Sequence, residues 1–388
     1  MADINTVVDM VKDSHIIDTL TKSPNMEGIA IAGLTILGVS TIVVYAIRSI
    51  APVTPFLYAN ARIQARSPYY ISSKKIEELS GIKSISELRD ALKSSDYGES
   101  LEQSKTKSLR SFHAALEKGF LMSIKELEDM SPKKMKDVIR SYAMFLEATV
   151  IKTVYRAKLF DNPLDEDLVF SVGNITQVLL KHLKEAQSIP DLNVVMGSTH
   201  YSDIFSDRYE NIEEFDKRID EFVLKSFIDS VKKTKVKQAP LIIDIVNKKV
   251  DILNILALIK FRIRGIDAEK QAAYLINNDS AISDRFSSMS KAENLHDLVE
   301  AVKGSEYHEA MKDALDSYDK DGSLFHFENK LYKFYGSYVD DIEKLNSLGA
   351  YPIASFLIKK EIEKRNLFIL SKGIDSGFSA ERIKEMVV

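Results

Sequence analysis

One uncharged apolar stretch, residues 28–47, constrains more than any other feature what this chain can fold into. It reads GIAIAGLTILGVSTIVVYAI, and the nearest charged residues are Glu27 before it and Arg48 after it. A helical rise of about 1.5 Å per residue makes this stretch about 30 Å long, the thickness of a bilayer's hydrocarbon core. A buried helix of a soluble domain would carry a polar stripe, and here there is none beyond Thr35, Ser40 and Thr41. We therefore predict one transmembrane helix over residues 28–47.

The segments on either side of this stretch predict its orientation. Residues 1–27 form a short acidic arm, which is too long and too negatively charged to be the leader of a signal peptide. Downstream, Arg48, Arg62 and Arg66 all precede the first acidic residue, Glu77. Because positive residues flank the cytoplasmic side of a membrane helix, we expect the rest of the chain to lie at the cytoplasmic face of the cell membrane.

The composition of the chain excludes several classes of function. Cysteine is absent, which excludes thiolate catalysis, disulfides and cysteine-bound zinc. The net charge of −4 gives no general attraction to nucleic acid. Only 15 glycines and 9 prolines occur in 388 residues, which argues against a turn-rich β architecture.

Helical periodicity dominates the sequence after the apolar stretch, and we predict an all-α fold. Ser84 and Glu87 have the spacing of a capping box, and Ser131-Pro132 opens a long helical run that ends near Asp161. Further helical patterns cover residues 164–187, 211–233, 240–265, 267–276, 295–302, 309–317, 327–345, 352–372 and 380–387.

A faint internal repeat divides this helical region. Glu147, Asp251 and Glu363 each stand four residues before an aliphatic residue, and they lie 104 and 112 residues apart. These spacings are too long for solenoid repeats and suit three helical subdomains of about a hundred residues each. Chance similarity among amphipathic helices is the alternative. The predicted arm, transmembrane helix and three subdomains cover residues 1–27, 28–47, 48–163, 164–266 and 267–388.

The segment Leu57–Arg66, LYANARIQAR, resembles YANARxRA, the opening motif of the C subunits of archaeal A-type ATP synthases. This family is the counterpart of the d subunits of eukaryotic V-ATPases. Gln64 stands where the family has its second arginine. The resemblance covers residues 55–388. Further matches lie at Asp251–Ile255, Glu361–Leu367, Gly373 and Glu381–Glu385.

The resemblance implies a non-catalytic subunit with a funnel-like body of three similar all-helical subdomains. Such a protein sits on the cytoplasmic face of the proteolipid ring, receives the foot of the central shaft, and couples ion flow through the ring to ATP synthesis. The expected partners are the proteolipid ring, the central-shaft subunits and the membrane, with no nucleic acid, cofactor or small-molecule substrate. The hydrophobic N-terminal extension departs from many members and resembles some methanogen versions. The rival interpretation is a single-span, membrane-anchored helical adaptor unrelated to ATP synthesis.

Residues that could carry chemistry are scattered along the chain. No glycine-rich phosphate-binding motif occurs, and no two histidines have the i, i+4 spacing of a metal site. We therefore predict no catalytic, cofactor-binding or metal-binding residue. The seven histidines are His15, His113, His182, His200, His296, His308 and His326.

The segment from Ser317 to Glu328 partly matches the calcium-binding loop of an EF-hand. Asp319, Asp321 and Gly322 fall at positions that such a loop requires, but Ser317 stands where the loop needs its opening aspartate. A helix–helix turn rich in aspartate and glycine explains the same residues. Both interpretations of the segment stay open at this point.

Five lysines form a basic cluster near the middle of the chain. A charge run of this kind is typical of a solvated helix end, or of contact with anionic lipid headgroups or an acidic partner surface. The cluster consists of Lys225, Lys232, Lys233, Lys235 and Lys237.

Overall fold

The computed structural model describes residues 38–41, 43–45, 47–48, 50–66, 71, 73–104, 108–164 and 168–388. These residues are mostly helical, and the only β pairing among them is an isolated bridge between Val172 and Ile175. The predicted all-α class is therefore confirmed. The chain divides into two compact units, Met1–Pro55 and Phe56–Val388, and the second unit is called the body below.

The predicted transmembrane helix falls largely on residues whose structure is not described. Residues 1–27 and the first half of the 28–47 stretch lie outside the described ranges, which begin at Gly38. Within those ranges, no helix is both long enough and apolar enough to cross a membrane. The acidic arm and the membrane helix therefore stay predictions.

The body contains long and short helices. Its long helices are α8 (Leu109–Met130), α9 (Lys133–Leu159), α13 (Ile212–Thr234), α14 (Ala239–Ile263), α19 (Phe325–Leu345) and α20 (Tyr351–Asp375). Its shorter α-helices are α4 (Leu57–Ala65), α5 (Ser73–Leu79), α6 (Ile85–Ala91), α7 (Gly98–Gln103), α10 (Gln177–Glu185), α11 (Ile189–Met196), α12 (Ser202–Ser206), α15 (Ala268–Tyr274), α16 (Phe286–Lys291), α17 (Leu295–Ala301), α18 (His308–Asp321) and α21 (Ala380–Met386). Two 3₁₀ turns are η1 (Thr54–Phe56) and η4 (Ser283–Arg285).

The predicted helix over residues 164–187 is wrong in its first half. Helix α10 begins at Gln177, after the bridge between Val172 and Ile175 and a turn at Gly173. The φ angle of Gly173 is +53°, which glycine adopts without the steric penalty of a Cβ. A Cβ at this position would also clash with the carboxylate of Glu147. The helical pattern is therefore interrupted where the chain passes close to a buried acid.

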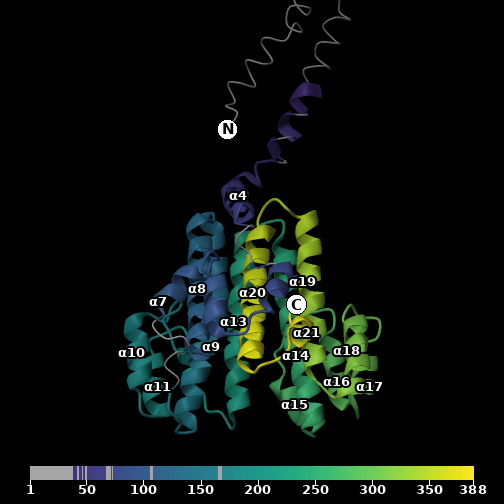
Figure 1. Ribbon diagram of the computed structural model, residues 1–388. Helices are drawn as coiled ribbons and strands as arrows, with labels where there is room; N and C mark the ends of the chain where they lie inside the picture. Colours follow the sequence, from purple (N-terminus) through teal and green to yellow (C-terminus); the bar gives the residue numbers. More distant parts are fainter. Residues whose placement is uncertain are drawn as a thin grey trace, which may run out of the picture. The chain divides into compact units, whose positions relative to one another are not determined.

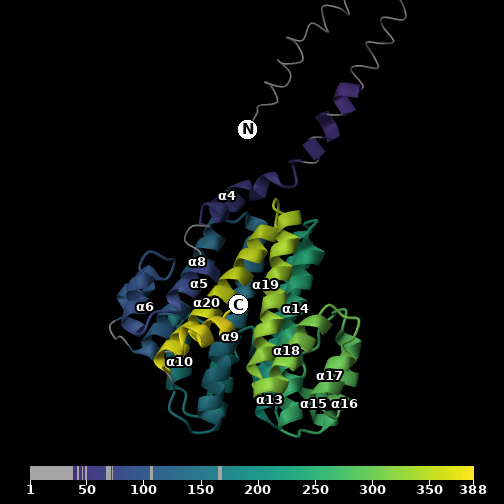
Figure 2. The same ribbon diagram turned by 45° about the vertical axis from the view of Figure 1, so that its right-hand side comes forward.

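The long helices pack side by side. Helix α20 packs against α8 and α19, and α9 packs along α13 (Figure 1). Figure 2 shows the same arrangement turned by 45°, with the short helices α15 to α17 grouped beside α18. The N-terminal helix α4 also contacts α8 and α20.

Buried apolar side chains of the body form three clusters. The largest collects residues from most of the long helices, including Tyr142, Phe227 and Tyr335. The second lies between the C-terminal half of α9, the N-terminal half of α13, and helices α10 to α12. The third joins residues 71–116 to residues 367–387, so the first helices share a core with the last two.

This core arrangement bears on the three predicted subdomains. The boundaries expected after residues 163 and 266 fall in the connections that follow α9 and α14. The C-terminal helices α20 and α21, however, complete a core that begins near Ile71. The division into three consecutive subdomains stays a prediction.

Candidate functional site

Three acidic side chains are buried near the middle of long helices. They are Glu147 on α9, Asp251 on α14 and Glu363 on α20, the residues that define the internal repeat. An ionised carboxylate is costly to bury unless hydrogen bonds or a positive charge compensate it. We call each acid, together with the groups that contact it, the Glu147, Asp251 or Glu363 cluster.

In the Glu147 cluster, a fully buried carboxylate is held mainly by neutral donors. Its Oε1 accepts from the backbone N–H of Asn174 at 2.7 Å and from the Asn174 side-chain amide at 3.0 Å. Its Oε2 accepts from the hydroxyl of Tyr201 at 2.8 Å. Burial and the negative charge of Glu147 raise the pKa of Tyr201, so this hydroxyl keeps its proton and stays a donor.

The Asp251 cluster repeats this arrangement. The Asp251 carboxylate accepts from the side-chain amide of Asn278 at 2.7 Å and from the hydroxyl of Tyr307 at 2.9 Å. Burial raises the pKa of Asp251, and the hydrogen bonds from these groups oppose the rise. The asparagine and tyrosine correspond to the partners of Glu147.

In the Glu363 cluster, a lysine takes part. Glu363 accepts from the backbone N–H of Ile71 at 3.2 Å and pairs with Lys360, one turn earlier on α20. The Lys360 ammonium also lies 3.1 Å from the Asp96 carboxylate and 4.7 Å from the centre of the Tyr97 ring. Burial and the charge of Glu363 raise the pKa of Tyr97. Burial also raises the pKa of Glu363 itself.

The three tyrosines are presented by one local structure. Each tyrosine follows a serine or threonine by two residues, and that hydroxyl accepts the tyrosine backbone N–H at 3.1, 3.2 or 3.3 Å. A short helix precedes each turn, and its N-cap side chain accepts a backbone N–H of the first turn. The N-caps are Ser84, Ser188 and Asn294, and the pairs are Ser95–Tyr97, Thr199–Tyr201 and Ser305–Tyr307.

These turns carry a sequence signal that the acidic repeat does not capture. In each copy, an acid stands three residues after the N-cap residue and a leucine four residues after it. A serine or threonine stands eleven residues after the N-cap residue, and the tyrosine stands thirteen residues after it. The three copies begin 104 and 106 residues apart. This pattern is more specific than the acidic repeat because each position has a local structural reason.

The helices α9, α14 and α20 meet at the positions two residues before the three acids. These positions are Phe145, Lys249 and Glu361. The Lys249 ammonium lies 2.7 Å from the Glu361 carboxylate and 4.8 Å from the centre of the Phe145 ring, and the hydroxyl of Tyr142 donates to Glu361. Burial alone would raise the pKa of Glu361, but Lys249 and the Tyr142 hydroxyl outweigh burial and lower it. We call Lys249 and Glu361 the central ion pair.

In two of the clusters, the residue three positions before the acid is a lysine that forms an ion pair of its own. Lys248 and Lys360 each pair with the acidic residue that precedes the tyrosine of their own cluster. Those acidic residues are Glu306 and Asp96 respectively. In the Glu147 cluster the two positions hold Met144 and His200, and no lysine–acid pair forms between them.

Three residues after the acids, the same two clusters carry asparagine. The side chain of Asn254 makes two hydrogen bonds, both 2.9 Å long, with the backbone of Ile276. Asn366 pairs in the same way with Val388, at 2.7 and 2.9 Å. Both partners lie 22 residues further along the chain. Val150 takes the asparagine position on α9.

Both ends of the body complete the Glu363 cluster. In the Asp251 cluster the chain continues from Ile276 to Asn278, whose amide reaches the acid. In the Glu363 cluster Asn366 holds Val388, and the backbone N–H of Ile71 donates to the acid. The residues that bind Asp251 come from one continuous segment, and those that bind Glu363 come from opposite ends of the body.

The scattered histidines do not converge on one site. His113 is held between α8 and α20, with its Nε2 3.0 Å from the hydroxyl of Ser371 and its ring stacked on Phe368. Burial, and secondarily the charge of Lys372, lower the pKa of His113 to about 4, so it is neutral at physiological pH. His15 lies outside the described residues. Among the described residues, no group of three or more acids and histidines could hold a metal ion.

The EF-hand-like segment forms a helix–helix turn. Helix α18 continues to Asp321 and ends at Gly322, whose φ is +69°, so Ser317 and Asp319 lie on the helix. Helical residues two positions apart point to different faces and do not converge on one cation. Asp319 and Asp321 each pair with a histidine. A calcium loop of the EF-hand type is therefore not formed.

One end of the body carries the lysine cluster. We call it the α4 end; it consists of α4 and the turns 235–238 and 346–350. The Gln238 amide donates to the Leu348 carbonyl at 2.8 Å, and the Asn60 amide donates to the Gly349 carbonyl at 3.1 Å. All five clustered lysines are exposed, and within the described ranges none makes an ion pair. Exposed apolar side chains at the same end are Leu57, Tyr58, Leu345 and Leu348.

Comparison with known proteins accounts for this architecture. A family model described as "ATP synthase (C/AC39) subunit" matches residues 59–386. The A-type ATP synthase C subunit of Methanocaldococcus jannaschii is 25% identical over 399 aligned positions, covering 100% of this chain and 99% of the relative. The C subunit of the Pyrococcus furiosus enzyme is 25% identical, covering 86% of this chain and 90% of the relative. That of Methanothermobacter thermautotrophicus is 22% identical, covering 94% and 96%.

The fold and these matches define a non-catalytic stalk subunit of an ATP synthase. Within that class, the chain belongs to the ATP synthase (C/AC39) subunit family. The resemblance found in the sequence is confirmed, and family membership rules against the unrelated adaptor. The alignment with the Methanocaldococcus relative covers the whole chain and so includes the residues that precede the family match at residue 59.

Proposed function

We propose that this chain is the central-stalk C subunit of an archaeal A-type ATP synthase, a rigid coupling piece between the proteolipid ring and the rotating shaft. Family membership supports the assignment to the complex. The observation that carries the mechanical part is the meeting of α9, α14 and α20 at the central ion pair. No step of ATP chemistry is assigned to the chain itself.

A coupling piece has to resist shear between its helices when torque is applied. Burial of apolar surface is non-directional and lets packed helices slide. A hydrogen bond to a charged group contributes about 1.5–3 kcal/mol and weakens steeply as its geometry is lost. Each of the three clusters ties the middle of a long helix to a neighbouring turn by such bonds. The body is therefore stiff where rotation would load it.

We propose that the α4 end faces the membrane and the proteolipid ring. Exposed lysines beside exposed Leu57, Tyr58, Leu345 and Leu348 suit a surface with anionic headgroups and apolar helix ends. Chain continuity supports the same choice. Only residues 48–56 separate the end of the predicted membrane helix from Leu57, and such a segment reaches at most about 35 Å.

The first test is co-purification of the full chain with its complex. The affinity tag should be placed at the N-terminus, because Val388 is held by Asn366 and a C-terminal tag would disturb that contact. Recovery of the catalytic subunits and the proteolipid from gently solubilised membranes is the expected result. A chain recovered without any other component of an ATP synthase contradicts the proposal.

The orientation can be tested by crosslinking, because the chain has no native cysteine. Leu345→Cys places a thiol at the α4 end, where that side chain is 83% exposed. The matched control is Val194→Cys, on α11, where the side chain is 81% exposed. We expect crosslinks to the proteolipid from the first variant and not from the second. Crosslinking to the proteolipid from Val194→Cys alone would reverse the orientation.

A further inference from the structure

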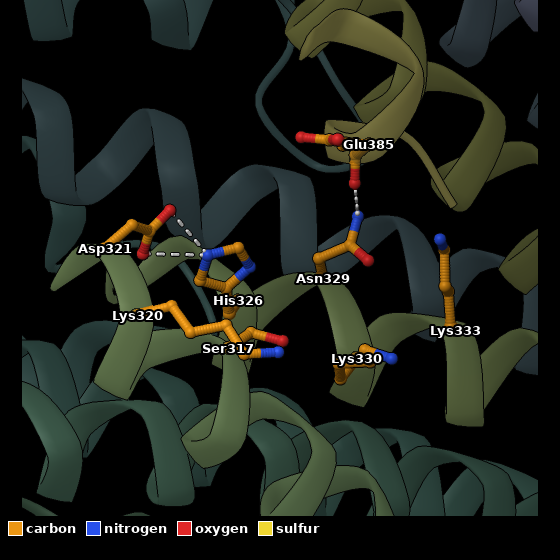
Figure 3. Close-up of a pocket in the computed structure, with 8 residues that line it drawn as sticks. All are labelled: Ser317, Lys320, Asp321, His326, Asn329, Lys330, Lys333 and Glu385. Carbon is orange, nitrogen blue, oxygen red and sulfur yellow. Dashed lines mark hydrogen bonds and ion pairs between the residues drawn. The ribbon is translucent and has the colours of Figure 1, made fainter. Parts of the chain in front are cut away.

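A cavity of about 360 Å³ opens between the end of α18, the start of α19 and helix α21. Figure 3 shows the side chains around it. Its volume lies at the lower end of the range of about 300–1,000 Å³ that is usual for small-molecule sites. Neither the internal repeat nor the central ion pair involves this cavity.

Positive charge dominates the cavity wall. Lys320 comes from α18, and Lys330 and Lys333 lie one turn apart on α19. Lys320 and Lys333 have no acidic partner within the described ranges, and Lys330 lies 3.3 Å from the exposed Asp313. Partial burial, and secondarily the positive charge of Lys330, lower the pKa of Lys333.

The two acids at the cavity differ in how far they are neutralised. Asp321 is hydrogen-bonded to His326 at 2.9 Å and lies 3.8 Å from the Arg382 guanidinium, which offsets its negative charge. Glu385, on α21, has no ion pair within the described ranges and opposes an incoming anion. The second ring nitrogen of His326 turns toward Asn329 in Figure 3 and adds a polar group to the wall.

We propose that this cavity binds a phosphate group, with Lys320, Lys330 and Lys333 as its cationic ligands. Lysine binds phosphate as a point charge, and a doubly charged group relieves repulsion between neighbouring ammonium groups. The phosphate source is either a soluble molecule or a lipid headgroup. His326 and Leu345 are 19 residues apart on α19, which places the cavity about 28 Å along the helix from the α4 end. This favours the soluble source, a choice that rests on the proposed orientation.

The test is isothermal titration of the full-length chain in detergent with inorganic pyrophosphate and with inorganic phosphate. Saturable binding is expected, with the two probes competing. The double variant Lys330→Gln/Lys333→Gln should weaken binding by about tenfold or more, as expected for losing charged ligands. Glu385→Gln should strengthen it, because it removes the opposing charge. Lys291→Gln, an exposed lysine on α16, is the matched control and should change nothing.

A structural readout separates a built site from diffuse attraction. Pyrophosphate should slow amide exchange in α21, which forms one wall of the cavity, and should leave α11 unchanged. The phosphate proposal is overturned if no saturable binding occurs, or if Lys291→Gln weakens binding as much as the double variant. Binding only to vesicles that contain phosphatidic acid would move the source to lipid and would contradict the orientation. Failure of the complex to co-purify would leave these binding results unaffected, so the two proposals fail separately.

Discussion

The Glu147 and Glu363 clusters both compensate a buried carboxylate, but with different partners. Glu147 accepts hydrogen bonds from neutral donors that lie 27 and 54 residues away in sequence, and the ring of His200 lies 3.7 Å from its carboxylate. Glu363 is held by a backbone donor 292 residues away and by Lys360, which itself reaches an acid 264 residues away. A loop about ten times longer costs about 2 kcal/mol more to close. In the Glu363 cluster, the ion pairs of Lys360 offset the larger loop-closure cost of joining the two ends of the body.

The comparison predicts the largest effect for Lys360→Met. The Lys360 side chain is 1% exposed, and its removal leaves Glu363 buried without its cation and leaves Asp96 with Arg66 alone, at 3.4 Å. Breaking a buried ion pair on one side typically costs about 3–5 kcal/mol. The midpoint of urea unfolding should fall accordingly. The control is Met144→Leu, at the corresponding position on α9, where a volume-conserving change should cost less than about 1.5 kcal/mol.

The loss of unfolding free energy on replacing a tyrosine should be larger where fewer other groups compensate the buried acid. Tyr201→Phe removes a hydroxyl that donates to a fully buried carboxylate and should cost about 1.5–3 kcal/mol in unfolding free energy. Tyr97→Phe should cost less than about 1 kcal/mol, because the Tyr97 hydroxyl has no hydrogen-bond partner among the described residues, while Lys360 and Ile71 compensate Glu363. Equal losses in chemical denaturation would show that the lysine contributes nothing to the difference.

Asn366→Val should loosen the end of the chain and leave most of the body intact. The corresponding position of α9 is Val150, so the substitution gives the Glu363 cluster the apolar residue that the Glu147 cluster has there. Two hydrogen bonds to Val388 are lost, worth about 1–3 kcal/mol together. Amide exchange of residues 383–388 should accelerate relative to residues 212–234. Uniform acceleration along the chain would contradict a local role.

The smallest effect concerns pH. The pKa of His113 is lowered to about 4, below its ordinary value of 6.5, so the unfolded chain takes up this proton more readily than the folded one. Stability should therefore fall as pH drops from about 6.5 to 4. After allowance for solvent screening, His113 accounts for roughly 1 kcal/mol of that fall.

The control for this prediction is His113→Gln, which removes the titrating group. The raised pKa of Glu363 gives the opposite slope, because the folded state binds that proton more tightly. The difference between the wild type and His113→Gln isolates the histidine. Parallel curves of melting temperature against pH would exclude it as the acid-sensitive group.

The parts of this structure that could be predicted from sequence are those with a local cause. Capping side chains, helical periodicity and the segment Leu57–Arg66 predict the all-α class and the family without knowledge of distant contacts. The turns that present Tyr97, Tyr201 and Tyr307 are also local, and their N-cap-to-tyrosine spacing was available in the sequence. The prediction of a helix over residues 164–187 missed the turn at Gly173, whose positive φ and close approach to the distant carboxylate of Glu147 leave no mark in the local helical pattern.

The central ion pair could not be predicted in this way. Lys249 and Glu361 lie 112 residues apart, and each looks like an ordinary charge on an amphipathic helix. Only the packing of α14 against α20 brings them together, beside Phe145 of α9. The phosphate cavity has the same origin, since its walls come from three helices. The membrane helix over residues 28–47 stays a prediction.

Closure of the third core by α20 and α21 has a consequence for synthesis of the chain. Leu88 and Phe112 emerge from the ribosome about 250 residues before their core partners Leu367 and Leu370. At a synthesis rate of about 5–20 residues per second, their apolar surface stays without those partners for roughly 10–50 s. Helices α5 to α8, although made early, are thus among the last to be buried. Chaperone dependence should therefore concentrate on the apolar residues of α5 to α8, although they are buried in the folded body.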